Sequence, residues 1–324
     1  MSIRKQHPNF PLKLNLESIK DLEQTLGYPI VSIKYFCKNK TSNVKELTLM
    51  QYKNGKLKEP RIVYNPTRQY KKLLRVINSK LLAKADLPDG VLGGVIGKCI
   101  DDMVYRHCNQ EAVLSMDMKK FFPNINSDRV MGFLRAAGCS PQIAGILTDS
   151  VTLDSSLPQG FPTSPMLANL IAFGLDDQHL SQARKNNLHR TRWIDDIVFS
   201  GRSKDLKACV KSLLGAIKFH GFQLSNKKTE YQVRAHNPII AGLNVAGKTP
   251  QLPIIVFDRI RDILHECKHS GVDVVQLKYE SDSFGRMKDL KSSLKGRILY
   301  VSRYNEIAGK ELIEIFDSID WRNK

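Results

Sequence analysis

The sequence has no uninterrupted apolar run near the ~18 residues that a membrane span requires, so we expect no transmembrane helix. Its first residues, MSIRKQHPNF, lack the apolar core of a secretory signal. The six cysteines are scattered without a C-x-x-C pair, which indicates free thiols in a reducing compartment and disfavours a structural zinc site. Together these absences predict a cytoplasmic protein.

Acidic residues are comparatively few. The chain carries 50 Lys and Arg against 32 Asp and Glu, a net charge of +18, and both termini and the middle are basic. Such an excess predicts a polyanionic partner, of which nucleic acid is the commonest, with general solubility as the alternative. No long amphipathic helix with an aromatic face is present, so binding to a membrane surface is disfavoured.

The apolar patterns predict an α+β fold. Helical patterns cover 16–27, 68–85, 127–137, 141–152, 165–187, 203–220, 257–269 and most of 284–319. Strand patterns cover 30–36, 46–52, the segment from 111 to a turn at Pro123, and a hairpin with strands ending at 194 and starting at 197. The middle thus reads strand, helices, hairpin, helix, strand, which favours an antiparallel sheet over βαβ alternation.

Two adjacent aspartates, Asp195 and Asp196, interrupt the strand-forming run RTRWIDDIVFS. Like charges side by side repel, so either they lie in a solvated turn or a cation binds between them. If the strand that ends at Asp117 pairs beside this hairpin, Asp117 and Asp195 converge at one sheet edge. Three carboxylates there would suit Mg²⁺, and two such ions could activate an attacking hydroxyl and stabilise a leaving pyrophosphate.

A series of motifs resembles retron-type bacterial reverse transcriptases, in that family's order over roughly 59–305. The segments are EPRIVYNP, GGVIGKCI, LSMDMKKFFPNI, LPQGFPTSPMLANL, WIDD, LSNKKTEY, IAGLNV and LKGRILYVSRYN. The resemblance implies a right-hand polymerase with fingers over 1–110, palm over 111–246 and thumb over 247–324. It implies an RNA-directed DNA polymerase that uses two Mg²⁺ ions.

The resemblance also implies roles for individual residues. Asp117, Asp195 and Asp196 would bind metal and carry catalysis. Gln159 and Gly160 resemble the loop that lies against the incoming nucleotide, and Arg61 resembles the fingers arginine that grips the triphosphate, for which a guanidinium is suited.

Two lysines, an aromatic pair and two further positions complete the candidate site. Lys227 or Lys228 would donate a proton to pyrophosphate, the alternative for each being a solvated helix end. Phe122 would clash with a 2′-OH and so favour deoxynucleotides. Because Phe121 and Phe122 would be neighbours at a strand end, we expect one in the core and one in the site, although both could be core. Trp193 would face the primer end or pack in the core, and Arg297 would contact primer–template.

The chain departs from the family at several positions. Trp193 stands in place of the usual tyrosine. The N-A-x-x-H element reads Met103-Val-Tyr-Arg-His107, and the V-T-G element reads Ile240-Ala241-Gly242.

The resemblance implies partners as well. They are a cognate structured noncoding RNA of msr–msd type, its DNA product, deoxynucleotides and an effector protein in anti-phage defence. Two rival hypotheses stay open: a defence reverse transcriptase that is not a retron, and a non-catalytic RNA-binding scaffold.

Overall fold

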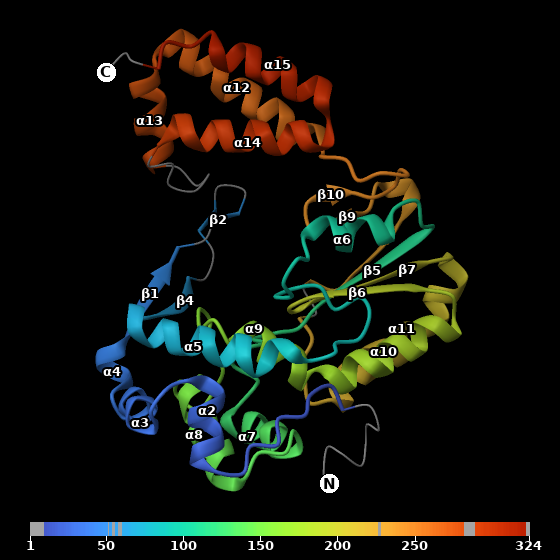
Figure 1. Ribbon diagram of the computed structural model, residues 1–324. Helices are drawn as coiled ribbons and strands as arrows, with labels where there is room; N and C mark the ends of the chain where they lie inside the picture. The colour runs from blue at the N-terminus through green and yellow to red at the C-terminus, as the bar shows by residue number, and fades with distance from the viewer. Residues whose placement is uncertain are drawn as a thin grey trace. The chain divides into compact units, whose positions relative to one another are not determined.

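The structure is a computed structural model that describes residues 10–50, 52–53, 56–57, 60–225, 228–281 and 289–321. It divides into two compact units, one of residues 1–47 with 62–236 and one of residues 48–61 with 237–324. Figure 1 shows the elements of both units. Within the described ranges, no helix has the length and apolar character needed to cross a membrane.

The centre of the first unit is a four-stranded sheet in the order β6-β7-β5-β8. Its strands are β5 (Ala112–Asp117), β6 (His189–Trp193), β7 (Asp196–Gly201) and β8 (Glu230–Val233). Every pairing in it is antiparallel. Helix α11 contacts β5 and β7, and α10 contacts β6, so both helices pack on the sheet (Figure 1). The α+β fold with an antiparallel sheet is therefore confirmed.

The remaining elements of the first unit are mostly helical. They are α2 (Ile19–Leu26), α3 (Ile30–Lys38), α4 (Lys40–Asn43), α5 (Arg68–Lys80), α6 (Ile100–Val104), α7 (Ser127–Ala136), α8 (Pro141–Val151), α9 (Ser164–Ile171), α10 (Phe173–Lys185) and α11 (Ser203–Phe219). Two further strands, β1 (Val44–Leu49) and β4 (Arg61–Pro66), pair with each other. Local signals explain the helix ends: Ser18 and Asp21 form a capping box on α2, which stops at Gly27 in a left-handed conformation.

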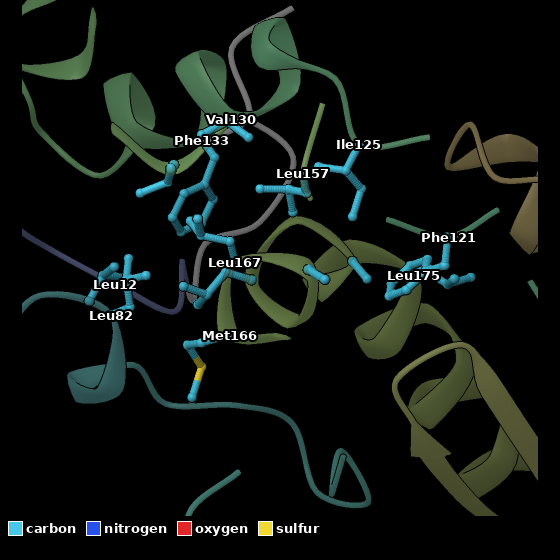
Figure 2. Close-up of a cluster of buried hydrophobic side chains, with 14 of the residues drawn as sticks. Leu12, Leu82, Phe121, Ile125, Val130, Phe133, Leu157, Met166, Leu167 and Leu175 are labelled. Carbon is cyan, nitrogen blue, oxygen red and sulfur yellow. The ribbon is translucent and has the colours of Figure 1, made fainter. Parts of the chain in front are cut away.

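One continuous apolar core joins the helices to the sheet. Side chains from the N-terminal segment, the short 3-10 turn Leu82–Lys84 after α5, the turn after β5, α7 and α9–α10 meet in it, as Figure 2 shows. The labelled members are Leu12, Leu82, Phe121, Ile125, Val130, Phe133, Leu157, Met166, Leu167 and Leu175. The turn after β5 contributes Phe121 and Ile125 to this core, and the LPQGFPTSP loop contributes Leu157 and Phe161, so close packing fixes both loops beside the end of the sheet.

The second unit has a helical core of its own. It contains the short hairpins β2 (Tyr52–Lys53) with β3 (Lys56–Leu57) and β9 (Ile239–Ile240) with β10 (Leu243–Asn244). Its helices are α12 (Ile254–Ser270), α13 (Val272–Ser281), α14 (Leu290–Tyr304) and α15 (Glu306–Asp317). Ile263, Leu264, Leu294, Ile298 and Leu312 are buried between them.

Several element predictions need correction. The strand expected over 30–36 is helix α3, because Ile33 and Phe36 are buried at helical spacing and α3 packs on α8. The single helix expected over 165–187 is two, α9 and α10, which separate at Ala172. The break lets α9 pack on α7 while α10 packs on the sheet. The helical prediction for 284–319 holds where the chain is described, and 284–288 lie outside the described residues.

Candidate active site

The strand pairing brings the aspartates to one end of the sheet. Strand β5 pairs with β7 in the expected way, and Asp117 lies directly opposite Asp196. Strands β6 and β7 form a hairpin in which Trp193 is opposite Asp196, so Ile194 and Asp195 make the two-residue turn. The amide of Met118 donates to the carbonyl of Asp195 at 3.0 Å, which ties the turn to the end of β5.

The three carboxylates create a region of concentrated negative charge. Burial first, then the charges of Asp195 and Asp117, raise the pKa of Asp196 to about 6 from an ordinary value of 3.8. Asp196 is exposed as a whole residue, but its carboxyl stands close to two like charges. Asp117 is 6% exposed. The arrangement therefore disfavours full ionisation of the cluster without a cation.

Lys228 supplies one positive charge to this cluster. Its Nζ donates to Asp117 Oδ2 at 2.6 Å, and its side chain is 59% exposed. The hydrogen bond to Asp117, with the charges of the three aspartates, raises the pKa of Lys228, so it stays protonated at neutral pH. Lys227, the other candidate, lies outside the described residues.

The donor chemistry of the cluster fits a divalent ion. Carboxylate oxygens are the ligands that Mg²⁺ prefers, and a cation would remove the repulsion that raises the pKa of Asp196. Within the described ranges, no group of three or more His, Cys, Asp or Glu is arranged as a ready-made metal site.

The loop that holds Gln159 and Gly160 packs directly on strand β4. The amide of Tyr64 donates to the carbonyl of Gln159 at 2.7 Å. Gly160 has φ +109, and a Cβ there would lie 2.3 Å from the Tyr64 carbonyl oxygen. Only glycine fits so close an approach with this backbone conformation. Arg61 is exposed at the start of β4 and belongs to the second unit.

The aromatic pair follows β5 in a turn rather than on a strand. Strand β5 ends at Asp117, Lys120 has φ +49, and the amide of Asn124 donates to the Lys120 carbonyl at 2.9 Å. Phe121 is 2% exposed and lies against Phe222, with 5.3 Å between ring centroids. Phe122 is only partly buried. Phe121 is thus a core ring, whereas Phe122 is partly buried and packs against that core. The turn, and not the alternation of a strand, gives the two rings their different burial.

Trp193 and Arg297 occupy different units. Trp193 ends strand β6 beside the aspartates and is partly buried. Arg297 lies on α14 in the second unit, where burial, followed by the charge of Arg259, lowers its pKa.

Sequence reasoning missed a buried ionic cluster beneath the hairpin. Asp176 of α10 accepts hydrogen bonds from Arg190 and Arg192 of β6, and all three side chains are fully buried. The one available signal was that two arginines stand two positions apart in a strand, so that their side chains share one face of it. His107 is also buried and bridges Ser200 and Thr191 with contacts of 2.6 and 2.7 Å.

Asp117, Asp195 and Asp196 lie together at one end of an antiparallel sheet, and such grouped carboxylates are a donor set that two-metal sites use. A sequence profile of the family described as "Reverse transcriptase (RNA-dependent DNA polymerase)" matches residues 51–268. The chain belongs to that family, and it is an RNA-directed DNA polymerase. Enzymes of this family generally use divalent metal ions.

Several curated relatives are similar over most of the chain. Retron Se72 reverse transcriptase from Salmonella heidelberg is 25% identical over 311 residues, which cover 93% of this chain and 79% of the relative. Retron Ec86 reverse transcriptase from Escherichia coli is 29% identical over 270 residues, 80% of this chain and 81% of the relative.

Among solved structures, telomerase from Candida albicans, in a complex with a fragment of telomeric RNA, is similar with a TM-score of 0.45 and 10% identity. The match covers 88% of this chain and 60% of the telomerase chain.

Proposed function

We propose that this chain is the reverse transcriptase of a retron. It copies a cognate structured noncoding RNA of msr–msd type into single-stranded DNA, primed from a 2′-OH of the same RNA, and the product is a branched RNA–DNA molecule. The observation that carries the proposal is the similarity to retron Se72 reverse transcriptase over 93% of this chain. The grouping of Asp117, Asp195 and Asp196 at one end of the sheet supports a catalytic role for these three residues.

The proposed chemistry follows from the residues at the sheet edge. Asp117, Asp195 and Asp196 would hold two Mg²⁺ ions. When bound, these ions would activate the attacking hydroxyl and stabilise the leaving pyrophosphate. Lys228 stays protonated and hydrogen-bonded to Asp117, so it is able to donate a proton to the leaving group.

The loops around the edge would select and hold the nucleotide. Gln159 and Gly160 would lie against the incoming nucleotide, and Arg61 would grip its triphosphate. Phe122, the accessible member of the aromatic pair, would exclude a 2′-OH. We propose that Trp193 supports the primer end beside the aspartates and that Arg297 contacts the duplex backbone.

We propose that residues 1–110, 111–246 and 247–324 serve as fingers, palm and thumb. The separate helical core of the C-terminal segment supports the thumb assignment. The net charge of +18 supports a nucleic acid partner, read mainly through shape and phosphate contacts. Anti-phage defence with an effector protein, and a cytoplasmic location, complete the proposal, the latter supported by six unpaired cysteines.

The test is expression of the chain with about 500 bases of its flanking DNA, followed by analysis of co-purified nucleic acid. An Asp195→Ala/Asp196→Ala variant is the matched control. The proposal predicts DNA with the wild type and none with the variant, and a debranching enzyme should separate that DNA from RNA.

Each other outcome favours a rival. DNA that resists debranching would indicate a reverse transcriptase with another template or priming mode. RNA without DNA in both samples would indicate a non-catalytic RNA-binding scaffold.

A further inference from the structure

The turn that carries Asp195 has a backbone conformation that its sequence does not favour. Ile194, the first residue of the two-residue turn, has φ +57. Tight hairpin turns with positive φ at this position normally use glycine, because a β-branched side chain clashes with its own backbone there. The conformation must therefore be imposed by contacts from elsewhere in the fold.

A buried ion pair supplies one such contact. The guanidinium of Arg192 binds Asp176 with two parallel hydrogen bonds, Nε to Oδ1 at 2.7 Å and Nη2 to Oδ2 at 2.6 Å. Its remaining nitrogen, Nη1, donates to the carbonyl of Ile194 at 2.7 Å. Since both side chains are fully buried, Asp176 fixes the plane of the guanidinium and so fixes where that third hydrogen bond points.

A glycine-rich segment, residues 90–97 (GVLGGVIG), runs beside strand β6 of the same hairpin. The amide of Arg192 donates to the carbonyl of Gly90 at 2.7 Å, and the amide of Leu92 donates to the carbonyl of Arg192 at 3.0 Å. A Cβ at Gly93 would lie 2.5 Å from the Ile194 nitrogen, so only glycine allows this approach.

Asn169, from the LPQGFPTSPMLANL motif, also holds the glycine-rich segment in place. Its Nδ2 donates to the carbonyl of Gly93 at 2.9 Å, and the residue is fully buried. Three separate motifs of the chain thus converge on one turn.

We propose that Asp176 and Arg192 are positioning residues for catalysis. The pair holds the carbonyl of the strained Ile194 and keeps Asp195 and Asp196 in register with Asp117. Neither Asp176 nor Arg192 contacts the reacting atoms in this proposal, so their effect passes through the turn. The inference rests on the proposed catalytic role of the aspartates.

The test compares three variants in primer extension on a homopolymer RNA template, which does not depend on a retron RNA. Arg192→Lys keeps a cation beside Asp176 but removes the guanidinium nitrogen that donates a hydrogen bond to the Ile194 carbonyl. Arg190→Lys is the matched control, since Arg190 lies on the same strand and donates to the same carboxylate, and within the described chain its Nε and Nη1 have no partner. Arg192→Lys/Ile194→Gly adds a residue that adopts positive φ without strain.

The proposal predicts that Arg192→Lys lowers kcat about tenfold or more while the KM for deoxynucleotide is unchanged, since a small displacement of catalytic groups is costly. Arg190→Lys should lower kcat clearly less than Arg192→Lys, because Arg190 donates to Asp176 but makes no hydrogen bond to the turn itself. Glycine at 194 should restore most of the kcat that Arg192→Lys loses. A purely structural role for Arg192 would not be rescued in this way.

Three results would overturn the proposal. One is an equal loss of kcat in both lysine variants, and another is a soluble double variant that stays as slow as Arg192→Lys. If both Arg192→Lys and the double variant fail to fold, the ion pair serves folding and not the turn. A wild type that extends no primer would instead overturn the proposed function, and with it this inference.

Discussion

Replacing Asp196 with asparagine should abolish DNA synthesis and yet make the protein more stable at neutral pH. The pKa of Asp196 is raised to about 6 from an ordinary value of 3.8 by burial and by its acidic neighbours. The folded protein therefore binds more protons than the unfolded chain between these two values. The stability that this carboxyl contributes is fully present below pH 3.8 and is lost as the pH rises through about 6.

The size of the effect follows from that shift. About two pKa units correspond to roughly 3 kcal/mol before solvent screening. Asp196 is exposed, so screening reduces this to about 1 kcal/mol. Asparagine has nearly the same shape and does not ionise. We therefore expect Asp196→Asn to raise the free energy of unfolding by about 1 kcal/mol at pH 7.5 and by almost nothing at pH 4.

Urea unfolding followed by tryptophan fluorescence gives the measurement. The chain has two tryptophans, Trp193 in the first unit and Trp321 in the second. A Trp321→Phe background would leave Trp193 to report on the unit that contains the site. With a slope of about 2 kcal/mol per molar urea, the midpoint should rise by about 0.5 M at pH 7.5.

A matched control comes from an acidic residue that has a cationic partner. Asp205 binds Arg202 at 2.8 Å on the surface, so Asp205→Asn should lower stability slightly, by at most about 0.5 kcal/mol. Mg²⁺ should stabilise the wild type more than Asp196→Asn, because the variant lacks one ligand. Loss of stability in Asp196→Asn at pH 7.5, or a gain of equal size at pH 4, would refute the electrostatic reasoning.

Substitutions at Phe122, Lys228 and Gly160 test the site further, with Phe121→Ala as the comparison for Phe122. Phe122→Ala should reduce discrimination against ribonucleotides about tenfold or more in single-nucleotide incorporation. Phe121→Ala should instead lower the free energy of unfolding by about 3 kcal/mol. Unchanged discrimination in Phe122→Ala would exclude a role of Phe122 in selecting the sugar. Lys228→Gln should lower kcat about a hundredfold with little change in nucleotide KM, and full activity would exclude proton donation. Gly160→Ala should raise nucleotide KM, because its Cβ would lie 2.3 Å from the Tyr64 carbonyl oxygen; a KM equal to that of the wild type would contradict the close packing.

The strand pairing around the aspartates could be predicted because its signals are local. The apolar residues before Asp117 and the runs on both sides of Asp195 and Asp196 predict strands joined by a tight turn. The predicted turn falls one residue too late, because Ile194 and Asp195 form it and Asp196 already pairs in β7. Strand β5 beside this hairpin then has one register that buries its apolar face. The order of the motifs along the chain gave the family.

Other features depend on contacts that the local sequence does not contain. The segment 30–36 is rich in β-branched residues, yet tertiary packing against α8 makes it helix α3. Asp176 is separated from Arg192 by 16 residues and a helix end, so nothing local indicates that they pair. The left-handed Ile194 contradicts its own preference, and only the assembled fold accounts for it.

The most direct test of the account is primer extension on a defined RNA template by the purified chain and by Asp117→Asn. Asp117 is buried opposite Asp196, and asparagine preserves its shape while removing the charge. The account predicts template-dependent DNA from the wild type and no product above background from the variant, with the variant still folded and within about 1 kcal/mol of the wild type in urea, because it loses both the Lys228 ion pair and the repulsion with Asp196. Equal extension by both proteins would contradict the central claim that these carboxylates carry RNA-templated DNA synthesis.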